Sequence, residues 1–219
     1  MPIQGGNRLF KAAALLLNFD KSAIYPPFFA SWQIQVKKFC RKIEHQRVMK
    51  ILQQLLAPYP TEQFLTEHWT QKAIHISTDD SRKFHPFFSW CALNHLLNYH
   101  KLGEPDLRFF KEGKSLPETR DRRDWSDRLR QGATLIVNGV HQRIPSVAKL
   151  AAHLRDDIGY ETHVNLYCSP GDQRGFDCHY DTHDVLILQI EGEKKWFVYR
   201  DTVVYPTSDI PSSKQLQPT

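Results

Sequence analysis

The sequence lacks several features that define large classes of protein. No apolar run reaches the ~18 residues that a helix needs to cross a bilayer, so a membrane-embedded protein is excluded. Internal repeats are also missing. The four cysteines form no CxxC pair, which favours reduced thiols in a cytosolic protein over a disulfide framework or a zinc site. These cysteines are Cys40, Cys91, Cys168 and Cys178. With 41% hydrophobic and 24% charged residues, the 219-residue chain has the balance of a protein that buries a core, which excludes a disordered tail, a collagen-like fibre and a coiled coil.

Positive charge is concentrated in the first quarter of the chain. Residues 1–60 contain nine Lys and Arg side chains against Asp20 and Glu44, whereas residues 61–219 contain 20 Lys and Arg against 22 Asp and Glu. A basic segment of this kind can contact RNA or a ribosome. The alternative is a helix whose lysines are simply solvated, and this simpler interpretation is favoured.

An apolar run near the start raises the question of a targeting signal. Arg8 and Lys11 precede the apolar residues 12–17, as the basic and apolar parts of a secretory signal do. However, the run is short, polar residues end it, and no cleavage site of small residues follows. We therefore interpret residues 8–18 as a short amphipathic helix and expect a cytoplasmic protein.

Hydrophobic periodicity divides the chain into a helical half and a β-rich half. Apolar residues recur at helical spacing in the first half, and at strand-like spacing or in short apolar runs after Gly132. The charged stretch 103–130 predicts loops with one short helix. The predicted helices are 31–43, 48–56, 61–69, 90–97 and 147–154, and the predicted strands are 73–76, 133–137, 163–167, 185–190 and 195–199. The fold class is therefore predicted as α+β.

One short stretch carries recognisable chemistry. His179 and Asp181 are two residues apart where a strand begins, so their side chains leave on the same face. An imidazole and a carboxylate placed in this way are two thirds of the 2-His-1-carboxylate triad that holds Fe(II) and leaves positions open. The pair alone is a weak signal, because about one such pair is expected by chance in a chain of this composition.

The residues around this pair resemble the JmjC-type cupin oxygenases. His179-Tyr180-Asp181 is followed by the apolar strand 184–189 and then by Glu191-Gly192-Glu193-Lys194-Lys195-Trp196, in the order and spacing of the family's HxD, strand and LQxxGxKxW pattern. Three further segments, 165–171, 64–76 and 132–137, resemble earlier landmarks of that family. The resemblance covers roughly residues 48–205 and is strongest for the ribosomal-oxygenase branch, which hydroxylates Arg or His side chains of ribosomal proteins.

The resemblance implies a role for five residues. His179 and Asp181 would bind Fe(II), which 2-oxoglutarate would chelate through its keto acid end. Lys194 stands where this branch commonly has its basic residue, and would bind the distal carboxylate of 2-oxoglutarate as a compact positive charge. Asn165 and Tyr167 share a face of their strand and would donate hydrogen bonds to the cosubstrate. The alternatives are a surface lysine for Lys194 and a plain core aromatic for Tyr167. Trp196 is expected to be a core aromatic.

The chain departs from the family pattern near its end. The family completes its metal site with a second histidine, on a later strand preceded by a Gly-Asp turn. Here the last histidine is His183, and no such element is found in the 36 residues that follow it. His183 does not fit as the third ligand, because residues i and i+4 of a strand are ~13 Å apart. We therefore expect a chain that holds roughly the first half of a double-stranded β-helix and that does not turn over by itself, as a truncated or degenerate relative.

The resemblance also predicts the organisation and the function. We expect a basic helical extension over 1–57, a mixed region over 58–130 that leads into the JmjC-like domain, the first part of the cupin barrel over 131–205 and an irregular tail over 206–219. The expected function is Fe(II)- and 2-oxoglutarate-dependent hydroxylation of a protein side chain, with a ribosomal protein as one substrate and a homodimer formed by the full-length protein. The alternative is a catalytically dead binding module that holds RNA or a ribosomal protein through 1–60. A small-molecule oxygenase and a lysine demethylase also stay open.

Overall fold

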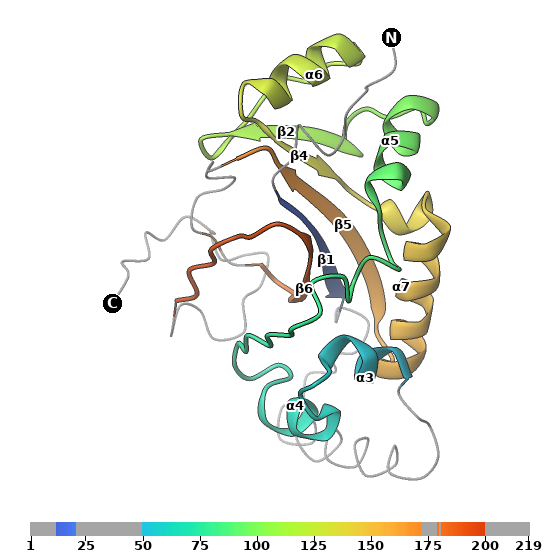
Figure 1. The fold of residues 1–219 in the computed structure, drawn as a ribbon, viewed down its shortest axis with the longest axis vertical. Helices are drawn as coiled ribbons and strands as arrows, with labels where there is room; N and C mark the ends of the chain where they lie inside the picture. Colours follow the sequence, from blue (N-terminus) through green and yellow to red (C-terminus); the bar gives the residue numbers. More distant parts are fainter. Residues whose placement is uncertain (1–11, 21–49, 172–178, 180, 200–219) are drawn as a thin grey trace.

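A single antiparallel sheet with helices packed around it organises the described part of the protein. The computed structural model describes residues 12–20, 50–171, 179 and 181–199 (Figure 1). The strands are β1 (Ala12–Asp20), β2 (Leu107–Lys111), β3 (Lys114–Ser115), β4 (Thr134–Val137), β5 (Glu161–Ser169) and β6 (Asp184–Glu191). The helices are α3 (Lys50–Leu56), α4 (Thr61–Glu67), α5 (Trp90–Tyr99), α6 (Arg122–Arg130), α7 (Pro145–Ile158) and the short 3-10 helix η2 (Val140–Gln142). The α+β class is confirmed.

The strands lie in the order β3-β2-β4-β5-β1-β6, and each neighbouring pair is antiparallel. β1 therefore lies inside the sheet, between β5 and β6, although it comes first in the chain. The predicted helix over 8–18 is wrong, because residues 12–20 form this strand. Leu15, Leu17 and Phe19 are fully buried on one face of β1. A short run that is apolar on both faces is typical of a central strand, but its periodicity alone does not distinguish it from a helix.

The longest helix, α7, supplies one wall of the hydrophobic core. Pro145 occupies its first turn, and Gly159 ends it in the left-handed conformation with φ of 79°. Its buried side chains belong to the same apolar cluster as Val164, Leu166 and Cys168, which alternate along β5. Figure 1 shows α7 running alongside β5. Each fully buried leucine at this contact contributes about 1.5–3 kcal/mol relative to exposure.

Helix α3 is attached to the C-terminal turn of α7 by a carboxylate. The backbone N–H groups of Ile51 and Leu52 donate to Asp157 Oδ2 at 3.0 and 2.9 Å. These N–H groups lie in the first turn of α3, where no intrahelical acceptor exists. Lys83 serves the other end of the same helix, because its ammonium group donates to the carbonyl of Leu55 at 2.7 Å.

The remaining predicted elements divide into those that form and those that do not. The helices at 48–56, 61–69, 90–97 and 147–154 correspond to α3, α4, α5 and α7, and the strands at 133–137, 163–167 and 185–190 correspond to β4, β5 and β6. The strands predicted at 73–76 and 195–199 are wrong, since neither segment pairs with a strand. Conversely, β2 and β3 form a hairpin inside the stretch predicted as loops with one helix.

Several predictions fall on residues that the structure does not describe. The predicted helix over 31–43 and the tail over 206–219 lie outside the described residues, as does most of the basic segment 1–60. Within the described ranges, none of the helices is long and apolar enough to cross a membrane.

Candidate functional site

The candidate site lies on one face of the sheet. Side chains of β5 alternate, so that Val164 and Leu166 face the core whereas Asn165 and Tyr167 face the other way. The strand register places Ile136 of β4 opposite Tyr167, and Arg108 of β2 opposite Ile136. These four side chains, Arg108, Ile136, Asn165 and Tyr167, therefore share one face, which we name the site face.

Lys194 lies against the site face. Its Nζ is 6.0 Å from the centre of the Tyr167 ring and 4.8 Å from the centre of the Trp196 ring. Both are cation–π distances. Burial lowers the pKa of Lys194, and the nearby Cys168 thiol opposes this effect. The neighbouring Lys195 is exposed, and its Nζ lies 4.9 Å from the centre of the Phe197 ring. Lys194 is thus a half-buried cation over Tyr167, and it differs in this from the lysine beside it.

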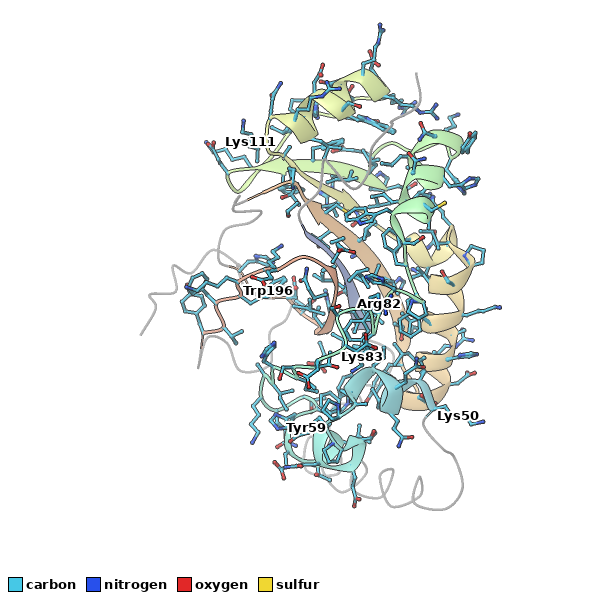
Figure 2. The ribbon with its side chains drawn as sticks, viewed as in Figure 1. Lys50, Tyr59, Arg82, Lys83, Lys111 and Trp196 are labelled. Carbon is cyan, nitrogen blue, oxygen red and sulfur yellow. The ribbon has the colours of Figure 1, made fainter. Side chains whose placement is uncertain are left out.

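Trp196 is exposed, although the sequence predicted a core aromatic. Its exposed fraction is 45%. Figure 2 shows it on the segment that follows β6, on the opposite side of the view from α7. The physical reason is that residues 195–199 do not form the predicted strand, so none of the described strands pairs beside the ring. Its contact with Lys194 is the one that bears on the site.

The pKa of Tyr167 is affected by its burial and by charged side chains of the site. Burial raises the pKa of Tyr167, the Asp181 carboxylate raises it further, and the Arg108 guanidinium acts in the opposite direction. The phenol is therefore protonated at neutral pH and can donate a hydrogen bond. The structure thus brings Tyr167, Asp181 and Lys194 together, three of the five residues predicted for the site.

Asn165 occupies the same face but already has a structural contact. Its Oδ1 accepts a hydrogen bond of 3.0 Å from the backbone N–H of Gly139. Gly139 lies in the turn between β4 and η2 with a φ of 61°, a conformation that favours glycine. Because the amide oxygen holds this turn, the side-chain NH₂ is the group of Asn165 that can serve a ligand as a donor.

The predicted metal-binding pair lies just before β6. His179 Nε2 and Asp181 Oδ1 are 3.8 Å apart, and the two side chains are 47% and 43% exposed. Ligand nitrogen and oxygen atoms lie ~2.0–2.2 Å from a metal such as zinc, so two of them can be up to ~4.4 Å apart on one ion. The pair therefore fits a single ion, and its N and O donors suit Fe(II). Within the described ranges, no cluster of three or more His, Cys, Asp or Glu side chains could hold a metal.

Arg108 is the site-face residue that sequence reasoning missed. It lies in the stretch predicted as loops with one helix, so no strand alternation was assigned to it. The available signal was the pattern Leu107-Arg108-Phe109, in which Leu107 and Phe109 are buried and the arginine between them points to the other face.

A match to a protein family indicates which class of protein this site resembles. The JmjC domain matches residues 140–218, which include β5, the His179–Asp181 pair and Lys194. The JmjC domain implies a cupin-like fold. The sequence-based resemblance to the ribosomal-oxygenase branch of this class is confirmed by the match together with the curated relatives.

Three of those relatives illustrate the similarity. The chain is 27% identical over 172 residues to ribosomal oxygenase 1 of Rattus norvegicus, covering 71% of this chain and 27% of the relative. It is 24% identical over 184 residues to the bifunctional lysine-specific demethylase and histidyl-hydroxylase NO66 of Drosophila persimilis, covering 78% and 26%. It is 28% identical over 163 residues to ribosomal oxygenase 2 of Bos taurus, covering 70% and 35%. The chain thus spans about a quarter to a third of the length of these relatives.

Proposed function

We propose that this chain carries the metal-binding pair and the cosubstrate site of an Fe(II)- and 2-oxoglutarate-dependent oxygenase that hydroxylates a protein side chain. The observation that supports the proposal most is the position of Lys194. A half-buried ammonium group lies over Tyr167, on the face that also carries Asn165, and the Asp181 carboxylate acts on the pKa of the same tyrosine. A carboxylate ligand bound to this cation would lie over Tyr167, on the site face.

Each residue has a role that its surroundings support. His179 and Asp181 would hold Fe(II), and the bound iron would supply the activation of dioxygen at its open positions. Lys194 would bind the distal carboxylate of 2-oxoglutarate, and its partial burial strengthens that attraction because fewer waters screen the charge. The Asn165 NH₂ and the Tyr167 hydroxyl would donate hydrogen bonds that orient the cosubstrate.

The substrate proposal rests on the relatives' names. Two of them are ribosomal oxygenases and one is named as both a lysine-specific demethylase and a histidyl-hydroxylase. We propose a protein side chain as the substrate of this chain, with ribosomal proteins as the first candidates. Contact with RNA through residues 1–60 and homodimerisation of the full-length protein stay predictions. Residues 12–20 of that basic segment lie inside the sheet, so they are not part of a detachable arm.

Metal binding tests the proposal. Mn(II), which replaces Fe(II) without reacting with oxygen, is titrated into the 219-residue chain and followed by electron paramagnetic resonance. His179→Ala and Asp181→Ala should each weaken binding by at least about 100-fold, because each removes a ligand, and changing only an outer partner of a ligand already costs about 10–100-fold. His183→Ala is the matched control and should leave the affinity unchanged.

The opposite result separates the two candidate functions. Equal Mn(II) affinity in the parent chain and in both ligand variants would contradict the metal assignment. The binding-module alternative would then gain support if the chain bound RNA with an affinity that falls steeply with salt and is lost when the nine Lys and Arg side chains of residues 1–60 are replaced by glutamine.

A further inference from the structure

Arg108 is a cation on the site face that the proposed roles leave without a function. It lies on β2, with Ile136 of β4 between it and Tyr167 of β5. Two strand spacings separate Arg108 from Tyr167, which is about 10 Å between their backbones. Ile136 between them is buried, with an exposed fraction of 2%. A ligand that contacts both Arg108 and Tyr167 would span the position of Ile136.

The guanidinium group of Arg108 has a hydrogen-bond donor that lacks an acceptor among the described residues. Its Nε is buried and, among the described residues, has no hydrogen-bond partner. None of the described acidic side chains forms an ion pair with it. Its Cζ lies 5.6 Å from the centre of the Phe110 ring, which provides stacking but no acceptor. Arginine stays charged at any pH at which the protein folds, so the buried N–H is a permanent donor. Leaving such a donor unsatisfied costs about 1–3 kcal/mol.

The position of this donor indicates which ligand would supply its hydrogen-bond acceptor. Lys194 is assigned to the distal carboxylate of 2-oxoglutarate. The keto acid end of 2-oxoglutarate would lie at the metal-binding pair. Arg108 is a second cation, two strands away from β5 on the side of β4 and β2. An acceptor at Arg108 would thus come from a different molecule, and a carboxylate matches the planar fork of a guanidinium with two parallel hydrogen bonds.

We propose that Arg108 is a specificity residue that binds a carboxylate of the substrate over Ile136, and so selects an acidic side chain at or beside the modified residue. The assignment of the carboxylate to the substrate rests on the proposed function. The same charge disfavours a substrate that presents lysine or arginine there, because two cations would then face each other in a partly desolvated site.

Nuclear magnetic resonance of the arginine side chain tests the proposal directly. In the ¹⁵N-labelled chain, the Nε–Hε signal of Arg108 is identified by its loss in Arg108→Lys. The metal-free chain is titrated with three capped tripeptides that differ only at the centre, Gly-Glu-Gly, Gly-Gln-Gly and Gly-Lys-Gly, and separately with 2-oxoglutarate. The glutamate peptide should shift this signal and bind about tenfold more tightly than the glutamine peptide, as expected for a charge-assisted hydrogen bond. The lysine peptide should leave the signal unchanged.

Variants sharpen the result. Arg108→Gln should remove the preference for glutamate over glutamine, and Arg108→Lys should keep part of it, because the charge remains without the fork. Arg120→Lys, which changes an exposed arginine already paired with Glu118, is the matched control and should keep the full preference. Equal binding of the glutamate and glutamine peptides to the parent chain would overturn the proposal. A larger shift with 2-oxoglutarate than with the glutamate peptide would overturn the assignment to the substrate.

The outcome is separable from that of the proposed function, because the titration needs no metal. Mn(II) binding is measured in parallel on the same preparations. A glutamate preference without Mn(II) binding would keep the Arg108 site and contradict the oxygenase proposal. Mn(II) binding without a glutamate preference would do the reverse.

Discussion

The two faces of β5 divide stability from function within a single strand. On one face, Val164, Leu166 and Cys168 are fully buried against the core that α7 covers. On the other, Asn165 and Tyr167 are partly exposed, and Tyr167 is surrounded by charges from other strands and loops. Because side chains alternate along a strand, one residue of β5 packs in the core and the next lies on the site face. A substitution at Leu166 should therefore mainly affect unfolding, and one at Tyr167 should mainly affect ligand binding.

The largest expected effect breaks the core face. Leu166→Ala should destabilise the protein by about 2–5 kcal/mol, since the side chain has no exposed area and its loss leaves a cavity. Tyr167→Phe, one position along and on the other face, should cost about 1 kcal/mol or less, because only a hydroxyl is removed. Urea unfolding of the two variants measures the contrast. Equal losses of unfolding free energy would contradict the division of the strand into two faces.

The second effect is confined to the site face. Lys194→Met should lower 2-oxoglutarate affinity by about 10–100-fold in the presence of Mn(II), the size expected for losing a hydrogen bond to a charged group. It should leave the unfolding free energy nearly unchanged, because a half-buried charge is replaced by an apolar side chain of similar length. Isothermal titration calorimetry measures the affinity, and Lys195→Met is the matched control. A similar loss of affinity in both variants would mean that general positive charge, rather than Lys194, attracts the cosubstrate.

A smaller effect concerns the attachment of α3 to the core face. Asp157→Ala should destabilise the protein by about 1 kcal/mol, because two N–H groups at the start of α3 lose their acceptor. Asp157→Asn keeps an oxygen at the same place and should recover a good part of that loss. The measurement is again chemical denaturation, with 2-oxoglutarate binding as a second readout that should not change. An Asn variant no better than the Ala variant would argue that the carboxylate acts by charge alone.

The smallest effect is a dependence on pH. His141 Nδ1 accepts a hydrogen bond of 3.2 Å from the backbone N–H of Val164 on β5, so it must be unprotonated. Burial lowers the pKa of His141 below its ordinary value of 6.5, and the adjacent His163 acts in the same direction, while Glu161 opposes it. The unfolded chain therefore takes up a proton at a higher pH than the folded one. Stability from this contact is complete above about pH 6.5 and falls as the pH is lowered below that value.

A variant isolates this pH dependence. His141→Asn should show a smaller drop in unfolding free energy between pH 8 and pH 5.5 than the parent chain. His153→Asn, an exposed histidine on α7, is the control and should follow the parent. An unchanged pH profile in His141→Asn would remove His141 as the source.

How much could be predicted from the sequence differs between these two faces and the segments around them. The sequence pattern led to Asn165, Tyr167, His179, Asp181 and Lys194, because a local motif carries their spacing. The structure brings Tyr167, Asp181 and Lys194 together, but sequence spacing did not reveal that the Asn165 amide oxygen holds the Gly139 turn. That contact joins residues 26 positions apart and has no local signature.

Strand β1 could not be predicted from its local sequence. Its apolar run is continuous, so neither helical nor strand periodicity is visible, and its strand state depends on pairing with β5 and β6 far along the chain. Arg108 was missed for a related reason, because the hairpin that sets its face has a charged, turn-rich sequence. The strand predicted at 195–199 is wrong for the opposite reason. Its composition is typical of a strand, but a strand forms only when it pairs with a neighbouring one.

The central claim is that the metal-binding pair and Lys194 serve one cosubstrate, and the coupling of two ligands tests it most directly. The affinity of the parent chain for 2-oxoglutarate is measured by calorimetry with and without saturating Mn(II), and again in Asp181→Ala. The account predicts that Mn(II) tightens 2-oxoglutarate binding by at least tenfold, that the enhancement is lost in Asp181→Ala, and that 2-oxoglutarate tightens Mn(II) binding by the same factor. A 2-oxoglutarate affinity that is identical with and without Mn(II) would contradict it.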